Sequence, residues 1–132
     1  LLQDFAILPD ILGICKFYVY NGLHLPELAE LISSLTGWDI DEAELLNIGE
    51  RVYNLQRMFN AREGVRRKDD YIPERARQIP EFGEHSSVEE CEIKEYDQML
   101  DEYYEARSWN KETGVPTKEK LQQLGLGALA KL

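Results

Sequence analysis

Apolar residues recur three or four positions apart along much of this chain, and no segment alternates apolar with polar residues as a half-buried strand would. The longest stripe lies between positions 42 and 64 and is formed by Leu45, Ile48, Val52, Leu55 and Phe59. Asp39 and Glu42 have the spacing of a capping box in front of this stripe, and Gly64 is suited to end the helix. The sequence therefore predicts an all-α fold, an irregular multi-helix bundle of about five helices.

Three further helices are expected from similar signals. They run roughly over residues 26–36, 93–107 and 117–124. Pro26 and Pro116 suit first turns, Gly37 and Gly125 suit helix ends, and Trp109 is expected to pack where the second of the three ends. Residues 65–91 lose the periodicity and contain several prolines and glycines, which predicts a long irregular connection with a short helix at 73–77.

The N-terminal segment is more ambiguous. Residues 1–8 are expected to form the apolar end of an element that Pro9 stops. The run from Ile11 to Tyr20 is apolar nearly all round, which predicts a buried element, and Asp10 as its N-cap favours a helix over a strand. Asn21-Gly22 is expected to close it.

Asp10 and Cys15 stand on either side of Gly13 inside this apolar run. One interpretation makes Asp10 a helix cap and Cys15 a small buried hydrophobe. In the other, Asp10 accepts hydrogen bonds from a ligand with adjacent N–H donors and Cys15 ligates a metal. An iron–sulfur cluster normally needs four thiolates, and Cys91 is the only other cysteine, so Cys15 could supply one ligand of a site but not the whole of it.

Composition narrows the possible partners. A formal net charge of -10 argues against binding to nucleic acid or to an anionic membrane surface. No apolar stretch approaches the roughly 20 residues that span a bilayer, and no signal-peptide pattern is present, so a soluble, cytoplasmic protein is expected. The length fits one domain. Because the sequence opens on Leu1-Leu2 without methionine, we expect this domain to be a piece of a longer polypeptide.

Charged residues alternate in sign from Arg62 to Arg75. The simpler interpretation is a solvated salt network, which would contribute little to stability. Alternatively, Arg62, Arg66 or Arg75 meets a phosphate or carboxylate of another domain. His24 and His85 lack partners at metal-site spacing, so a surface or helix-flank position is expected for both.

Several segments in one order resemble the C-terminal region of the tungsten-containing aldehyde ferredoxin oxidoreductase family. The strongest stretch is Ile48-Gly49-Glu50-Arg51-Val52-Tyr53-Asn54-Leu55-Gln56-Arg57-Met58-Phe59-Asn60-Ala61-Arg62-Glu63-Gly64, followed by Arg67-Lys68-Asp69-Asp70 and Pro73-Glu74-Arg75. The tail adds Leu100-Asp101-Glu102-Tyr103-Tyr104, Thr113-Gly114-Val115-Pro116-Thr117 and Leu124-Gly125-Leu126. The resemblance covers nearly the whole chain.

In that family an Asp-x-x-Gly-Leu-Cys motif contacts one of two pterins that hold tungsten, and also a neighbouring four-iron (4Fe-4S) cluster. The resemblance implies that Asp10 binds pterin N–H groups, that Cys15 is the fourth cluster ligand, and that the backbone around Ile14 and Lys16 lines the pterin. It also implies aldehyde oxidation with ferredoxin as acceptor. Ile14 replaces the usual leucine, a nearly volume-conserving change. Ser108 stands where glycine is usual.

The N-terminal pterin-binding domain and a Cys-x-x-Cys-x-x-x-Cys segment of that family are absent from this sequence. We therefore expect this chain to be a C-terminal helical domain that works only with the remaining N-terminal domains of an enzyme and with ferredoxin, and to bind no metal by itself. The competing hypothesis is a catalytically inactive helical module, truncated or orphaned, with a structural or partner-binding role.

Overall fold

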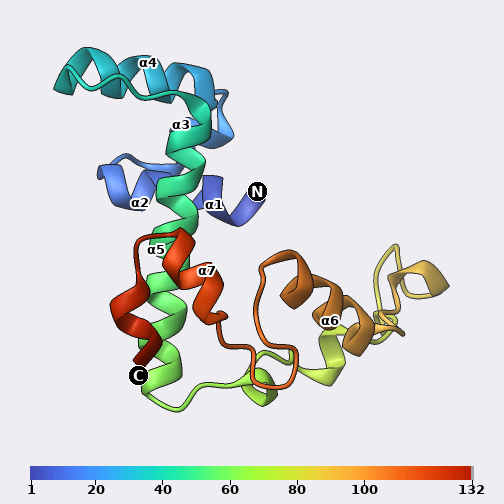
Figure 1. Cartoon of the computed structure of the whole chain (residues 1–132). Helices are drawn as coiled ribbons and strands as arrows, with labels where there is room; N and C mark the ends of the chain where they lie inside the picture. Colours follow the sequence, from blue (N-terminus) through green and yellow to red (C-terminus); the bar gives the residue numbers. More distant parts are fainter. Residues whose placement is uncertain (132) are drawn as a thin grey trace.

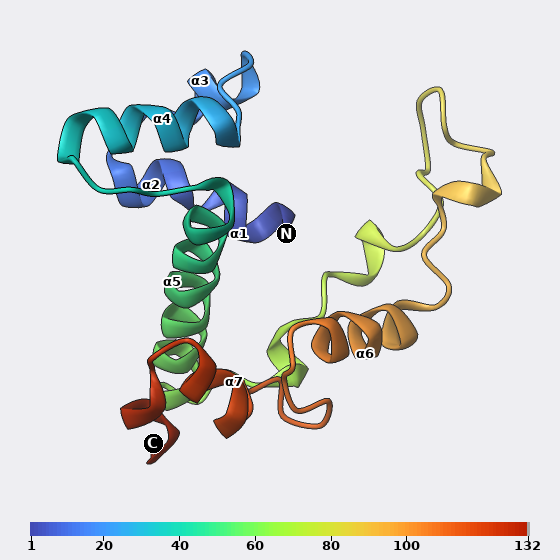
Figure 2. The same ribbon diagram turned by 45° about the horizontal axis from the view of Figure 1, so that its top comes forward.

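The computed structural model describes residues 1–131, and its secondary structure confirms the all-α prediction. The α-helices are α1 (Leu2–Ala6), α2 (Leu8–Leu12), α3 (Lys16–Tyr20), α4 (Leu25–Thr36), α5 (Glu42–Arg62), α6 (Tyr96–Ala106) and α7 (Lys118–Gln123). Long α5 forms a column, with α1 to α4 around its first half and α7 beside its second half (Figure 1). Helix α6 lies in an arm that projects sideways, as Figure 2 also shows.

Helix α5 begins two residues later than the predicted capping box. Its N-cap is Asp41, whose carboxylate accepts the Glu44 backbone N–H at 2.8 Å, so the prediction of Asp39 with Glu42 is wrong. The helix ends at Arg62, and Gly64 follows with a left-handed φ of 94°. A glycine there fits the prediction because this conformation is costly for other residues.

The apolar stripe predicted along α5 holds only in its first half. Leu45 is 2% exposed, whereas Leu55 and Phe59 are 45% and 57% exposed. The second half instead buries Asn54, Arg57, Met58 and Ala61. The buried face shifts because the two halves have different neighbours: α1 and α4 pack on the first, whereas Asn54 and Arg57 of the second bond to Trp109 and to the Gly114 carbonyl.

The N-terminal prediction needs the largest correction. Pro9 lies inside the first turn of α2, where its missing N–H costs nothing, so it starts this helix rather than ending the one before it. Asp10 is therefore a residue of α2 and not a cap. The run from Ile11 to Tyr20 is split at Gly13, which has a left-handed φ of 68°, into the end of α2 and the separate helix α3. Asn21 caps α3 as its C-terminal neighbour, close to the predicted end.

Residues 1–131 contain two hydrophobic clusters of buried residues. The first joins α2, α4 and α5 through Leu8, Leu28, Ala29 and Leu45. Helix α4 begins after His24, an exposed helix-flanking residue as expected, and ends at Gly37 with a φ of 73°. Its predicted apolar face is only partly buried, since Leu28 is 0% exposed and Leu35 is 74% exposed.

The second core lies at the base of the arm and contains Leu100, Tyr104 and Trp109. Trp109 therefore packs at the end of α6 as predicted. Its backbone N–H donates to the Tyr104 carbonyl at 2.8 Å, and it forms an isolated antiparallel bridge with Pro116. Helix α7 follows, capped by Thr117, whose hydroxyl accepts the Lys120 N–H at 3.2 Å.

The connection from 65 to 91 is irregular, as predicted. It contains three short 3₁₀ turns, η1 (Arg67–Asp69), η2 (Glu74–Ala76) and η3 (Glu89–Cys91), of which η2 lies where the short helix at 73–77 was expected. A further 3₁₀ turn, η4 (Gly127–Lys131), ends the described part of the chain. No helix in residues 1–131 combines the length and the hydrophobicity needed to cross a membrane.

Candidate cofactor-contact site

The residues predicted to contact cofactors lie in the turn between α2 and α3 and in the two helices beside it. Gly13 adopts the left-handed conformation, and this lets the Ile14 N–H return to the Pro9 carbonyl at 2.9 Å and close the end of α2. Cys15 then has extended backbone and is the N-cap of α3, whose first residue is Lys16. We refer to Asp10, Ile14, Cys15 and Lys16 as the turn site.

The turn site lies on the surface, contrary to the prediction of a buried element. Asp10, Cys15 and Lys16 are exposed and Ile14 is half-buried. The chain is split at Gly13, and the separate five-residue α3 buries none of its side chains, so its aromatic rings and the thiol of its N-cap Cys15 stay outside. The carboxylate and the thiol therefore carry no cost of burial within this chain.

An ion pair spans the turn site. The Lys16 ammonium lies 2.8 Å from the Asp10 carboxylate, and this hydrogen bond raises the pKa of Lys16 above its ordinary value. Both side chains are about half exposed, 46% for Lys16 and 52% for Asp10. Such a pair is weak in water, so the Asp10 carboxylate can exchange this partner for better-placed N–H donors at little cost.

Cys15 and Cys91 are both free cysteines, the first exposed and the second partly buried. Residues 1–131 contain no group of three or more His, Cys, Asp or Glu side chains placed to hold a metal ion. An exposed thiol without companion ligands suits a cluster only if other thiolates come from outside these residues. The turn site thus fits one edge of a cluster-and-pterin site: a reachable thiol, a reachable carboxylate and a glycine turn between them.

The alternating charges from Arg62 to Arg75 mostly form a network within the chain. Arg66 donates to the carbonyls of Ala61 and Val65, and Arg67 pairs with Asp97 and Asp101 on α6. These contacts fasten the start of the irregular connection to α5 and α6. The solvated pair of the simpler interpretation is found for Arg62 with Glu63, whereas Arg66 bonds to backbone carbonyls and Arg67 is only 18% exposed.

A buried polar network at the base of the arm escaped the sequence analysis. Arg57 holds Asp70 with both terminal nitrogens, at 2.7 and 2.5 Å, and donates from Nε to the Gly114 carbonyl at 2.7 Å. The Tyr104 hydroxyl donates to the same Asp70 carboxylate. Burial alone would raise the pKa of Asp70, but the hydrogen bonds from Arg57 and Tyr104 outweigh it and hold this pKa below its ordinary value.

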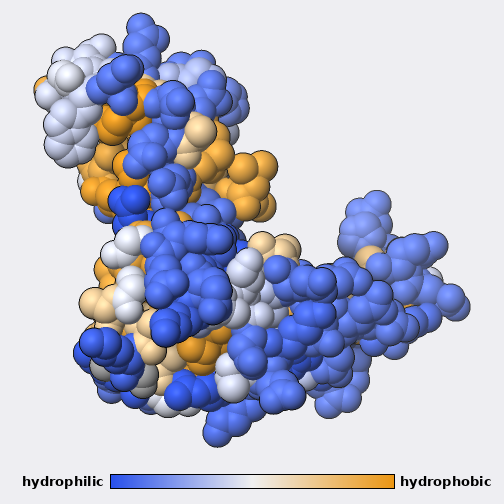
Figure 3. Space-filling view, viewed as in Figure 1, coloured by the Kyte–Doolittle hydropathy of each residue, from blue (hydrophilic) through white to orange (hydrophobic). Residues whose placement is uncertain are grey.

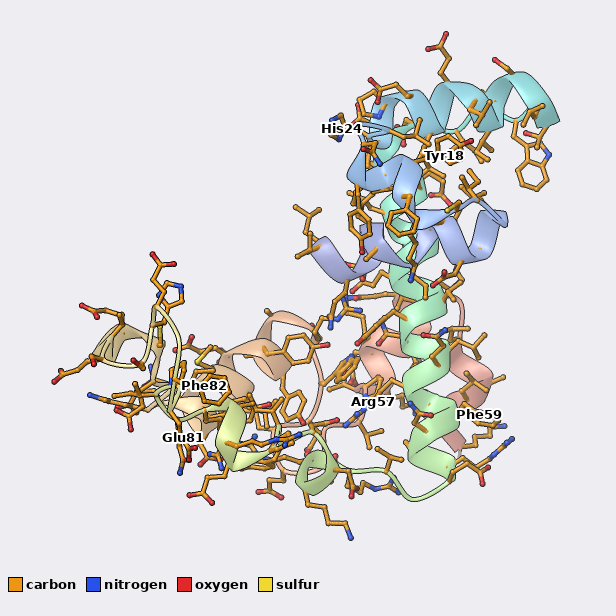
Figure 4. The ribbon with its side chains drawn as sticks, turned by 180° about the vertical axis from the view of Figure 1, so that it is seen from behind. Tyr18, His24, Arg57, Phe59, Glu81 and Phe82 are labelled. Carbon is orange, nitrogen blue, oxygen red and sulfur yellow. The ribbon has the colours of Figure 1, made fainter. Side chains whose placement is uncertain are left out.

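Aromatic rings cover this network. Trp109 donates from Nε1 to the Asn54 side-chain oxygen at 2.8 Å, and the Arg57 guanidinium lies 5.1 Å from the centre of the Trp109 ring. Apolar periodicity gave no signal for this network, since Asn54 shares its face of the longest helix with Asn47, Glu50 and Arg51. Figure 4 shows Arg57 on α5 beside the arm, whereas Tyr18 lies at the α3 end of the molecule. The network is therefore separate from the turn site.

The known proteins to which this chain is similar are oxidoreductases. Residues 1–126 match the family described as "Aldehyde ferredoxin oxidoreductase, domains 2 & 3". The chain is 35% identical over 127 residues to the tungsten-containing aldehyde ferredoxin oxidoreductase of Pyrococcus furiosus, and 34% identical to that of Pyrococcus abyssi. Each match covers 96% of this chain but only 20% of the relative.

A solved structure also shares the fold. The chain titled "Active site complex BamBC of Benzoyl Coenzyme A reductase in complex with 1,5 Dienoyl-CoA" aligns with a TM-score of 0.72 and 27% sequence identity. The match covers 97% of this chain and 19% of that one. This chain therefore spans about a fifth of the length of the proteins that it matches.

Proposed function

This chain belongs to the aldehyde ferredoxin oxidoreductase family, and from that membership we propose that it is the C-terminal helical domain of a tungsten-bispterin, iron–sulfur oxidoreductase. The proposed enzyme oxidises aldehydes or another oxo group and passes the electrons to ferredoxin. The observation that supports this most is the turn site: the family motif falls on a glycine turn whose carboxylate and thiol both face outward, where a group held by another domain can reach them.

In this proposal each residue of the turn site has a defined task. Cys15 provides the fourth thiolate ligand of a 4Fe-4S cluster, because its exposed Sγ is the part of the site that favours iron. Asp10 leaves Lys16 and accepts two adjacent N–H groups of a pterin, an arrangement that suits a bidentate carboxylate. The backbone at Ile14 and Lys16 borders the same pterin. When bound, the tungsten-bispterin and the cluster supply the oxidation of the substrate and the onward electron transfer.

Asp10 and Cys15 are five positions apart in the sequence, and in this proposal they connect the pterin, which donates the electrons, with the cluster, which carries them onward. Asp10 would fix the pterin and Cys15 the cluster, with a single turn of backbone between them. The half-buried side chain of Ile14 anchors that turn, since it packs against the core formed by Leu8, Leu28 and Leu45. A rigid turn would hold the two cofactors at a constant separation.

The proposal is tested by replacing the turn-site residues in the assembled enzyme. We expect Cys15→Ala to lower the iron content and the visible absorption of the cluster after anaerobic purification, and Asp10→Ala to lower the tungsten and pterin content. Matched controls are Cys91→Ala, which removes the other free cysteine, and Asp39→Ala, which removes another exposed carboxylate. Both controls should keep full cofactor content.

A contrary result has a clear meaning. If the Cys15→Ala and Asp10→Ala enzymes retain iron, tungsten and pterin as well as the controls do, the turn site does not contact the cofactors. The chain would then be better described as a helical module with a structural or partner-binding role. The isolated chain is expected to purify without metal, and iron in stoichiometric amount on it would point to a cluster held between chains.

A further inference from the structure

The turn site contains a single cation, Lys16, in surroundings that are poor in charge. Between positions 11 and 23 it is the only charged residue, although charged residues make up 30% of the chain. Figure 3 shows hydrophobic surface gathered over the part that contains α1 to α4, while the arm around α6 is almost wholly hydrophilic. Because few other charges of the sequence lie beside it, the Lys16 ammonium dominates the electrostatics of the turn site.

Lys16 depends on one carboxylate for its counter-charge. Asp10, at 2.8 Å, is the only acidic residue in ion-pair contact with it within residues 1–131. The next acidic residues along the chain in either direction are engaged elsewhere: Asp4 holds Arg107 at 2.6 Å, and the Glu27 carboxylate accepts a backbone N–H at the start of α4 at 3.1 Å. Once Asp10 turns to a pterin, as in the proposed function, no carboxylate of the adjacent sequence is free to replace it.

A cluster held by Cys15 would supply the missing counter-charge. Iron–sulfur clusters with thiolate ligands carry a net negative charge, and their reduction adds one more negative charge. Lys16 directly follows Cys15 in the sequence, and its flexible stem carries three N–H donors that can turn toward sulfur. A cation beside the cluster stabilises the reduced form more than the oxidised form, and therefore raises the reduction potential.

We propose that Lys16 tunes the cluster: when the pterin takes Asp10, the released Lys16 ammonium turns to the cluster at Cys15 and raises its reduction potential. This inference rests on the proposed function, which assigns Asp10 to the pterin and Cys15 to the cluster. One electron released by oxidation of the substrate enters the cluster and later leaves for the acceptor, while Lys16 keeps its proton and forms no covalent bond. The higher potential favours movement of electrons from the pterin into the cluster.

The midpoint potential of the cluster in the assembled enzyme tests the proposal. It is measured by a redox titration with mediator dyes, in which electron paramagnetic resonance reports the reduced cluster. In Lys16→Met, which keeps the length of the side chain but removes its charge, we expect the ratio of reduced to oxidised cluster to fall about tenfold at a fixed potential, which equals a fall of about 59 mV in the midpoint. A unit charge about 10 Å away has an effect of this size at the effective dielectric constant of a protein.

Two control variants separate a charge beside the cluster from other effects. Lys16→Arg keeps the charge and should keep the potential of the unchanged enzyme. Lys94→Met removes one positive charge from the arm, where Lys94 pairs with Glu92 at 3.4 Å, and should leave the potential unchanged. An equal fall in Lys94→Met and Lys16→Met would reveal an effect of net charge alone and overturn the proposal, as would an unchanged potential in Lys16→Met.

The iron content of each variant is measured in parallel. If Lys16→Met purifies without iron, the titration is made with Lys16→Gln, for which the same fall in potential is expected. Loss of iron from both uncharged variants would overturn the proposal, because Lys16 would then be needed to hold the cluster and not to set its potential.

The outcomes also distinguish this inference from the proposed function. An unchanged potential in Lys16→Met, in an enzyme that loses iron with Cys15→Ala, would refute the tuning role and support the ligand role of Cys15. A lower potential in Lys16→Met, in an enzyme whose cluster survives Cys15→Ala, would do the reverse, since Lys16 would then act on a cluster that other residues hold.

Discussion

Replacing Asp70 by asparagine should release the arm from the α5 column. The substitution keeps the size of the side chain but removes the charge that Arg57 holds at 2.7 and 2.5 Å. Arg57 is only 9% exposed, so its guanidinium would be left inside the protein without a counter-charge. Removing one partner of a buried pair costs about 3–5 kcal/mol, and because Asp70 itself is 22% exposed we expect the lower end, about 3 kcal/mol.

Urea unfolding of the 132-residue chain, followed by far-ultraviolet circular dichroism, measures this loss. The comparison variant is Glu63→Gln, which breaks the pair between Arg62 and Glu63. Both side chains of that pair are more than half exposed, so its loss should cost no more than about 1 kcal/mol. A loss for Asp70→Asn as small as that of Glu63→Gln would refute the reasoning, because it would mean that the Arg57 charge is solvated after all.

The pH dependence gives an independent check on Asp70. Its pKa is lower in the folded chain than in the unfolded chain, so the unfolded state binds more protons as the pH falls. The stabilisation is complete above the unfolded pKa of about 3.9 and is lost as the pH falls through the lower, folded value. Unfolding free energy should therefore fall less steeply below about pH 4 in Asp70→Asn than in the unchanged chain.

Two further substitutions test local geometry. In Gly49→Ala the new Cβ would overlap the Asp4 carbonyl where α1 crosses α5, so we expect the free energy of unfolding in urea to fall by about 1–3 kcal/mol. The control is Gly127→Ala, where the atom nearest to the new Cβ is a flexible side-chain atom at 3.4 Å. Its free energy of unfolding should change little. In Lys16→Met the exposed pair with Asp10 is lost, and the free energy of unfolding should change no more than in Glu63→Gln, while a larger loss would show that this pair holds the turn in place.

Helix boundaries could be predicted from the sequence wherever the residue that ends or caps the helix interacts only with backbone groups next to it. Gly37 and Gly125 end their helices with left-handed backbone, and Thr117 caps α7, because these residues satisfy the nearby backbone without help from the rest of the fold. Pro9 misled the prediction because proline is compatible with two opposite roles, at the end of one element or in the first turn of the next. Only the packing of Leu8 against α4 and α5 decides between them.

The buried face of α5 could not be predicted from periodicity alone. Leu55 and Phe59 continue the apolar stripe, yet they are exposed, while Asn54 and Arg57 on another face are buried. Hydrophobic spacing assumes that the partner of a helix is apolar throughout. Here the second half of α5 packs against Trp109, which offers a hydrogen-bond donor, and Asp70, which offers an acceptor, so polar side chains fit that surface better than leucine would.

The sequence did not show what the turn site packs against, and this explains which predictions about it were right and which were wrong. Asp10, Gly13 and Cys15 were recognised as a group because a carboxylate and a thiol in an apolar run would be costly to bury. The structure removes that cost by exposing both, but it does so at the expense of three aromatic rings that are also left in water. Exposed polar site residues surrounded by exposed rings are what one side of an obligate interface looks like before its partner is added. The apolar run around the site therefore does not mark burial within this chain.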